Sequence, residues 1–290
     1  PENSRGIQHM AKEVIGIAGC GAMGEPMAQR LLTAGFEVWA HDVRPLAEFG
    51  AIAEHMLEDA AEFAKRCNVV ISAVRDVDQT RSLLFSEAQG IVRGASPPEI
   101  LVISSTVSPR FIRQLLTELP TQTSLVDAAM SGAPYRAREG TLSFMLGGPD
   151  AVVDRLMPIL QVMGNRLFRL GDVGMGMTTK VLNNYCAASS IAATHRVLGM
   201  AQVLGLDRRS LLEVMKHSSG SNWFADHIDQ IDWSDEGYSL DNTIGIVEKD
   251  VLATLDTVSE CPDIGRWPLD DGLLDALRRL EPLELESATR

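Results

Sequence analysis

The stretch that decides the fold runs from Val14 to Gly24 and reads VIGIAGCGAMG. Its first five residues form a short apolar run, which is typical of a strand buried on both faces. Apolar residues then recur at a spacing of four, as on one face of a helix: Met23, Met27 and Leu31. Gly35 ends this helix, and Phe36–Ala40 supplies a second strand. The stretch therefore opens a strand–helix–strand unit.

The same alternation continues along the chain. Further β-rich runs are separated by helix-compatible stretches such as Arg110–Leu119, and they lie at Val69–Val74, Ile100–Ser104 and Ser124–Ala128. Alternating strands and helices predict a parallel, doubly wound sheet with right-handed crossovers. Thr141–Leu146 and Arg166–Leu170 predict two added strands around a helix at residues 151–163.

The pattern changes after Gly171-Asp172-Val173-Gly174. Residues 175–204 contain no proline and place apolar residues at helical spacing, which predicts a helix of about 30 residues buried on most sides. The remainder predicts further helices at 208–216, 222–231, 240–258 and 269–280. We therefore expect an α/β protein, with a Rossmann domain at residues 11–172 joined by a long helix to an all-helical domain at 173–290. Residues 1–10 are interpreted as a vector-derived leader outside the fold.

Composition excludes several classes of protein. The 290 residues carry 26 basic and 39 acidic side chains, a formal net charge of −13, which disfavours nucleic acid and anionic membranes as partners. No apolar run approaches the ~18 residues of a membrane span. The four cysteines are far apart and lack metal-ligand spacing, so we expect small buried thiols, no metal and a reducing, cytoplasmic compartment.

The glycines of the opening stretch have separate roles. Gly19 permits a tight turn, Gly21 lets the backbone approach a pyrophosphate, and Gly24 allows close packing of helix on strand. Ala22 and Met23 complete the loop, and the helix N-terminus offers N–H groups to an anion. The pattern predicts dinucleotide binding, the alternative being a glycine-rich turn without a ligand.

Asp42 ends the second strand, eighteen residues after Gly24. A carboxylate at this place accepts hydrogen bonds from the adenosine ribose and repels a 2′-phosphate, which predicts NAD as the preferred cofactor with NADP still usable. Arg44, two positions on, can offset part of that repulsion. The alternative for Asp42 is an ordinary surface-turn residue.

Two later segments carry residues suited to a substrate. Ser131, with the amides of Gly132 and Ala133, can form a nest for a carboxylate, although an ordinary Ser-Gly turn explains the segment equally well. Lys180 and Asn184 lie four apart on the long predicted helix and share a face. A lysine in a buried helix is costly unless it is paired or functional.

Taken together, these segments resemble the β-hydroxyacid dehydrogenase family, which includes 3-hydroxyisobutyrate dehydrogenases. The resemblance covers nearly the whole chain after the leader and rests on four motifs in order: the glycine loop continuing to Met27-Ala28, Asp127–Gly132 with Gly140-Thr141-Leu142, Gly174–Asn184, and Lys249-Asp250. The departures are Met130 and Ala133, where a valine and a second glycine are usual, and the less usual Arg136 and Arg138. They leave the exact substrate open.

The resemblance implies roles for individual residues. Lys180 would be the acid/base, while Ser131, Gly132, Ala133 and Asn184 would hold a small anionic substrate. The cofactor would be contacted by the glycine loop and by three residues outside it, Val74, Thr106 and Lys249. The expected reaction is hydride transfer between NAD(P) and a small β-hydroxyacid, in a homodimer or homotetramer. An imine reductase-like enzyme, a 6-phosphogluconate-like enzyme and a non-catalytic cofactor-binding protein are the alternatives.

Overall fold

The computed structural model describes residues 13–259 and 261–283, so the predicted leader lies outside the described residues. The chain divides into two compact units, of which one ends at Lys180 and the other begins at Val181. Helix α8 (Met175–Val203) runs through this division. The domain boundary expected near residue 172 stays a prediction, and each unit is described by itself.

The first unit is built on a seven-stranded sheet formed within the described residues, in the order β2-β1-β3-β4-β5-β6-β7. The strands are β1 (Val14–Ala18), β2 (Glu37–His41), β3 (Val69–Ser72), β4 (Ile100–Ile103), β5 (Ser124–Ser131), β6 (Leu142–Gly147) and β7 (Gly164–Arg169). This arrangement confirms the predicted doubly wound sheet and its two added strands.

One pairing departs from the expected parallel arrangement. Strand β6 runs antiparallel to β5, while all other neighbours in the sheet are parallel. The connection between β5 and β6 holds only the short helix α6 (Pro134–Glu139), and a parallel crossover needs a longer link. β5 is also longer than predicted, since it continues past Ala128 to Ser131, which lies opposite Ser143.

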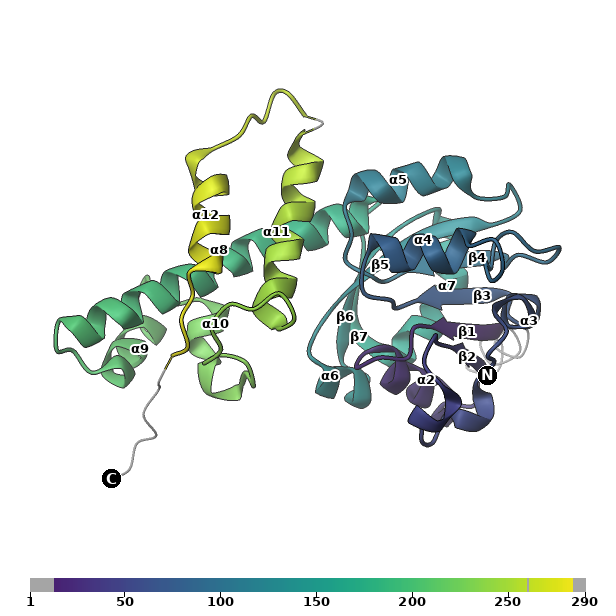
Figure 1. The fold of residues 1–290 in the computed structure, drawn as a ribbon, viewed down its shortest axis with the longest axis horizontal. Helices are drawn as coiled ribbons and strands as arrows, with labels where there is room; N and C mark the ends of the chain where they lie inside the picture. The colour runs from purple at the N-terminus through teal and green to yellow at the C-terminus, as the bar shows by residue number, and fades with distance from the viewer. Residues whose placement is uncertain (1–12, 260, 284–290) are drawn as a thin grey trace, which may run out of the picture. The chain divides into compact units, whose positions relative to one another are not determined.

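The sheet is buried on both faces because successive residues of each strand point to opposite sides. One core contains Ile15, Ile17 and apolar residues of α2 (Gly24–Thr33) and α7 (Asp150–Met163). The other contains Ala18 and apolar residues of α3 (Ala60–Arg66), α4 (Val77–Phe85) and α5 (Pro109–Glu118). Figure 1 shows α4 and α5 over the same part of the sheet. Two short 3₁₀ helices, Leu46–Glu48 and Ala53–His55, follow β2.

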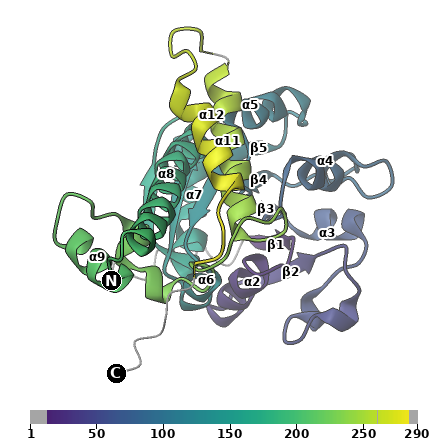
Figure 2. The ribbon, with the colours of Figure 1, turned by 60° about the vertical axis from the view of Figure 1, so that its left-hand side comes forward.

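The second unit is helical, as predicted. Its helices after α8 are α9 (Arg208–Lys216), α10 (Trp223–Asp226), the 3₁₀ helix η3 (Ile228–Gln230), α11 (Thr243–Ser259) and α12 (Pro268–Arg278). Two apolar clusters join them to α8: Ala188 and Ala192 pack with α11 and α12, which lie side by side in Figure 2, and Leu198 packs with α9 and α10. The single helix expected at 222–231 is instead two short pieces.

Helix α8 is less buried than its sequence predicts. Val203 is 87% exposed, Leu182 50% and Met200 42%, so the prediction of burial on most sides is wrong for the isolated chain. None of the helices formed by the described residues is long and apolar enough to cross a membrane.

Candidate active site

The glycine loop lies between β1 and α2, at the point where the strand order reverses, because β2 and β3 pair with opposite edges of β1. Gly19 has a φ of 90°, and its N–H donates to His41 O at 2.9 Å. A Cβ on Gly24 would lie 1.8 Å from Gly19 O, whereas one on Gly21 would meet nothing within 4 Å. Loop and helix are therefore in close contact, and the backbone at Gly21 is open to a ligand, an arrangement that fits a pyrophosphate.

Asp42 follows β2 and is tied to this loop. Its Oδ2 accepts the Cys20 N–H at 2.7 Å, and its Oδ1 accepts the N–H and Nε–H of Arg44 at 3.0 and 3.1 Å. Partial burial opposes ionisation, but the hydrogen bonds from Arg44 and Cys20 outweigh it and lower the pKa of Asp42. A charged carboxylate therefore stands at the place expected for the adenosine ribose.

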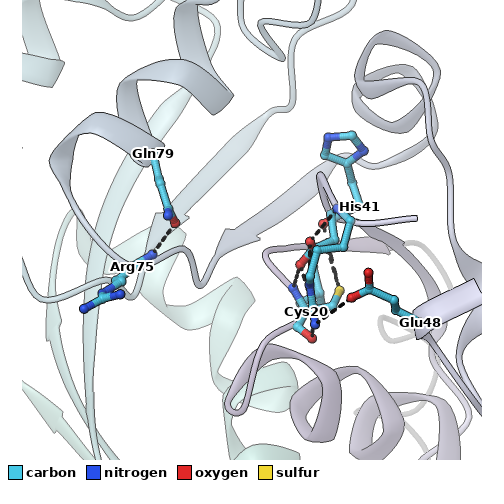
Figure 3. A network of polar contacts seen from close by, with 8 residues as sticks. Cys20, His41, Glu48, Arg75 and Gln79 are labelled. Carbon is cyan, nitrogen blue, oxygen red and sulfur yellow. Dashed lines mark hydrogen bonds and ion pairs between the residues drawn. The ribbon is translucent and has the colours of Figure 1, made fainter. Parts of the chain in front are cut away.

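The guanidinium of Arg44 covers this carboxylate. Nη2 also donates to Cys20 O at 2.8 Å, Nη1 lies 3.8 Å from Glu48 Oε2, and Cζ stands 4.6 Å from the centroid of the Phe49 ring. Figure 3 shows Cys20, His41 and Glu48 around this network. Sequence reasoning anticipated Arg44 as a modifier of cofactor choice but not its bonds to Asp42 and the loop.

The cysteines fall into two classes. Cys20 and Cys67 are buried, and burial raises the pKa of each thiol to about 12. Cys186 and Cys261 are exposed, so the prediction of buried thiols is wrong for these two.

The segments after β3 and β4 adjoin the loop. A Cβ on Gly19 would come within 2.9 Å of Val74 Cγ1, and Ser105 Oγ donates to Val74 O at 2.6 Å. Thr106 follows Ser105 and is half-buried. The structure therefore brings the predicted cofactor residues Gly19, Val74 and Thr106 to one edge of the sheet, with Ala22 exposed and Met23 at the N-cap of α2.

The predicted substrate segment lies where β5 ends. Ser131 is half-buried at the end of the strand, Gly132 is exposed with a φ of 138°, and Ala133 is the N-cap of α6. A Cβ on Gly132 would lie 3.1 Å from Arg136 Cδ, so the stem of Arg136 adjoins the segment, whereas Arg138 is exposed. Gly132 and Ala133 are both exposed, and the φ of Gly132 is one that favours glycine.

Lys180 is buried, with 8% of its surface exposed, and lies in α8. The first turn of this helix is held by Asp127 of β5, which accepts the N–H groups of Gly174 and Met177, each at 2.6 Å. Burial raises the pKa of Asp127 to about 6, and these backbone hydrogen bonds partly counteract the increase. Sequence reasoning placed Asp127 in a motif without giving it a role.

The second unit brings together Asn184 and Lys249. Asn184 Nδ2 donates to Asp250 Oδ2 at 2.5 Å, and Lys249 Nζ donates to Asp250 Oδ1 at 2.8 Å. Asp250 is 4% exposed, and sequence reasoning placed it in a motif beside Lys249 without giving it a role. In the part of the chain that the structure describes, no group of three or more acidic, histidine or cysteine side chains is suited to a metal ion.

Comparisons with known proteins agree with this arrangement. Residues 14–171 match the family model for the NAD-binding domain of 6-phosphogluconate dehydrogenase, and residues 174–262 match the model described as NAD-binding of NADP-dependent 3-hydroxyisobutyrate dehydrogenase. An L-threonate dehydrogenase from Cupriavidus necator is 34% identical over 84% of this chain and 82% of its own length. A 3-hydroxyisobutyrate dehydrogenase from Pseudomonas aeruginosa is 36% identical over 72% of this chain and 71% of its own.

Among solved structures, a Mycobacterium tuberculosis 3-hydroxyisobutyrate dehydrogenase with L-serine superposes with a TM-score of 0.76 and 26% identity. The match covers 91% of each chain. The cofactor loop, the order of the motifs and the matches over both units lead to one conclusion: the chain belongs to the β-hydroxyacid dehydrogenase family and is an NAD(P)-dependent hydroxyacid oxidoreductase.

Proposed function

We propose that this protein interconverts a small 3-hydroxyisobutyrate-like β-hydroxyacid and its semialdehyde or keto form, with Lys180 as the acid/base. The observation that carries the proposal is a buried lysine on a helix whose first turn is bonded to β5, the strand that ends at Ser131. The names of the relatives, L-threonate and 3-hydroxyisobutyrate dehydrogenases, support a small hydroxyacid as the substrate.

In the proposed mechanism, Ser131 and the amides of Gly132 and Ala133 hold the substrate carboxylate. The β-hydroxyl points at Lys180, whose neutral amine accepts the hydroxyl proton as the carbon gives up a hydride and the carbonyl forms. In reverse, the ammonium of Lys180 returns the proton to the oxygen. NAD, when bound, supplies the nicotinamide that accepts or donates the hydride.

The family resemblance also gives roles to Asn184 and Lys249, and the proposal includes them. Asn184 lies one helical turn beyond Lys180 and donates a hydrogen bond to the substrate, while Lys249 serves the nicotinamide end. Both are bonded to the buried Asp250, which limits their motion. Such support from a buried carboxylate reduces the ordering that binding would otherwise require.

We also propose that NAD is preferred over NADP. The support is the charged Asp42, held by Cys20 N at the end of β2. A 2′-phosphate at this place would meet a like charge, whereas the ribose hydroxyls of NAD would find an acceptor.

The proposed assembly is a cytoplasmic homodimer or homotetramer. Large apolar side chains are exposed along α8 and its C-terminal end, including Leu182, Met200, Val203 and Leu204. Exposed apolar side chains of this kind are typical of subunit interfaces. Light scattering during gel filtration tests the assembly, and a mass equal to one chain at micromolar concentration would contradict it.

The function is tested by absorbance of the reduced nicotinamide with a panel of small β-hydroxyacids, matching neutral alcohols and cyclic imines. We expect turnover with the acids and a fall in kcat of roughly 10²-fold or more in Lys180→Ala, with the fold and cofactor binding retained. The exposed Lys65→Ala is the matched control. Near-normal kcat in Lys180→Ala eliminates the mechanism, equal activity on neutral alcohols eliminates the carboxylate site, and reduction of imines alone favours the imine reductase alternative.

A further inference from the structure

Asp127 is a fully buried acidic residue, and hydrogen bonds to backbone amides satisfy both of its oxygens. Oδ1 accepts the N–H of Gly174 and Oδ2 accepts the N–H of Met177, each at 2.6 Å. These donors belong to the start of α8, where a helix has amide groups without intrahelical partners. Hydrogen bonds to a carboxylate are stronger than neutral ones, and a negative charge is favourable at a helix N-terminus.

Two glycines beside this carboxylate have no room for a side chain. A Cβ on Gly176 would lie 2.3 Å from Met145 O and 2.9 Å from Asp127 Oδ2. A Cβ on Gly147 would lie 2.5 Å from Asp127 Oδ1 and 2.9 Å from Gly176 N. Glycines on β6 and on α8 therefore allow the helix to approach the sheet closely, and the carboxylate fills the space between them.

The strand that provides this carboxylate also provides the proposed substrate residue. Asp127 and Ser131 are four residues apart on β5, so they point to the same face, separated by roughly 13 Å along the strand. Lys180 follows Met177 by three residues, or about 4.5 Å along the helix axis. Asp127 thus connects the helix turn preceding Lys180 to the strand that ends at Ser131.

We infer that Asp127 is a positioning residue, whose carboxylate fixes the first turn of α8 on β5 and thereby sets the location of the Lys180 amine relative to the substrate held at Ser131. This inference rests on the proposed role of Lys180. Proton transfer requires hydrogen-bond distance between amine and hydroxyl, so a shift of the helix by a fraction of an ångström slows the chemical step. Binding of the cofactor at the glycine loop does not involve this contact.

The test is Asp127→Asn, which keeps one acceptor oxygen but loses the charge and the second acceptor. We expect kcat to fall about 10- to 100-fold, with KM for NAD unchanged within about threefold. The primary deuterium isotope effect on kcat, with deuterium at the carbon that bears the hydroxyl, should increase because hydride transfer then limits turnover. Asp59→Asn is the matched control, since Asp59 also caps a helix of the first unit, accepting Glu62 N–H at 2.8 Å.

A purely structural cap gives a different result. If Asp127→Asn lowers the melting temperature but leaves kcat per active site and the isotope effect at the wild-type values, the inference is overturned. If Asp127→Asn does not fold, Asp127→Ser replaces it, because serine is smaller and still accepts one N–H, and the same outcomes apply. Lys180→Ala in the same assay separates the two proposals: an inactive Lys180→Ala beside an unaffected Asp127→Asn rejects only this inference, and an active Lys180→Ala rejects both.

Discussion

Replacing Asp42 with serine should convert the cofactor preference of this protein. The carboxylate accepts Cys20 N–H at 2.7 Å and is covered by Arg44, whose Nε lies 3.1 Å from Oδ1. Asp42→Ser removes the negative charge from the ribose site and releases the guanidinium of Arg44. The variant should therefore use NAD less efficiently and NADP more efficiently than the wild type.

The magnitude follows from three contributions. The Arg44 side chain is 43% exposed, so moving it off the carboxylate costs only about 0.2–1 kcal/mol. Hydrogen bonds from ribose hydroxyls to a carboxylate contribute about 1.5–3 kcal/mol to NAD binding. A 2′-phosphate at ~4 Å from the carboxylate meets a repulsion on the order of 4 kcal/mol at an effective dielectric of about 20, which salt reduces. The carboxylate therefore outweighs Arg44. The ribose hydrogen bonds and the repulsion both favour NAD and add to about 5.5–7 kcal/mol before screening. Salt and rotation of Arg44 toward the phosphate reduce this to roughly half, so removal of the carboxylate should shift the NAD-to-NADP ratio by about 3 kcal/mol, on the order of 100-fold.

The assay is kcat/KM for both cofactors in wild type, Asp42→Ser and Arg44→Ala at one ionic strength. We expect the wild type to prefer NAD, Asp42→Ser to lose or reverse that preference, and Arg44→Ala to retain NAD efficiency while losing residual use of NADP. The reasoning is refuted if the wild type uses NADP as well as NAD, or if Asp42→Ser changes the ratio less than threefold. Either result would mean that Arg44, and not Asp42, governs the pocket.

Three further predictions concern the loop, the second unit and pH. Gly24→Ala should lower both the melting temperature and the affinity for NAD, because the added Cβ would lie 1.8 Å from Gly19 O. The Cβ added by Gly21→Ala meets nothing within 4 Å, so this variant should lower the affinity for NAD at least tenfold and leave the melting temperature unchanged. Asp250→Ala should raise the substrate KM and lower kcat, each by roughly tenfold, in steady-state assays, since two partly buried hydrogen bonds are lost. Unchanged constants would exclude a role for Asp250 at the site. The pKa of Asp127 in the folded protein is raised from 3.8 to about 6. Between about pH 4 and pH 6 the folded protein therefore binds a proton that the unfolded chain does not bind. The contribution of Asp127 to stability declines as the pH rises through this window. Urea unfolding should show the stability of wild type relative to Asp127→Asn decreasing from pH 4 to pH 7, and a constant or increasing difference would contradict the raised pKa.

The elements that a local pattern determines were predictable from the sequence, and those that depend on distant partners were not. The strand–loop–helix–strand unit was predicted from features that lie within thirty residues: the apolar run, the three glycines and Asp42. The structure confirms this unit. The antiparallel β6 was missed because strand periodicity carries no direction. Asp127 bonds to residues 47 and 50 positions away, and Asp250 to Asn184 66 positions away, so no short-range spacing indicated either contact.

The same limit applies to side-chain conformation. Arg44 lies two residues from Asp42, close enough for sequence reasoning to connect them, but its rotamer depends on Cys20 O and the Phe49 ring. The roles assigned to Lys180, Ser131 and Lys249 stay predictions, since they depend on a bound substrate. What the structure adds is two buried carboxylates, Asp127 bonded to the first turn of α8 and Asp250 bonded to Asn184 and Lys249.

The division of the cysteines has a practical consequence for solution studies. Thiol reagents attack the thiolate, so Cys20 and Cys67, which are buried and have a pKa of about 12, should react far more slowly than the exposed Cys186 and Cys261. Both reactive thiols belong to the second unit, and neither is near the glycine loop in the sequence. A maleimide dye or spin label can therefore be attached to the helical unit of the wild-type protein while the dinucleotide loop stays chemically intact.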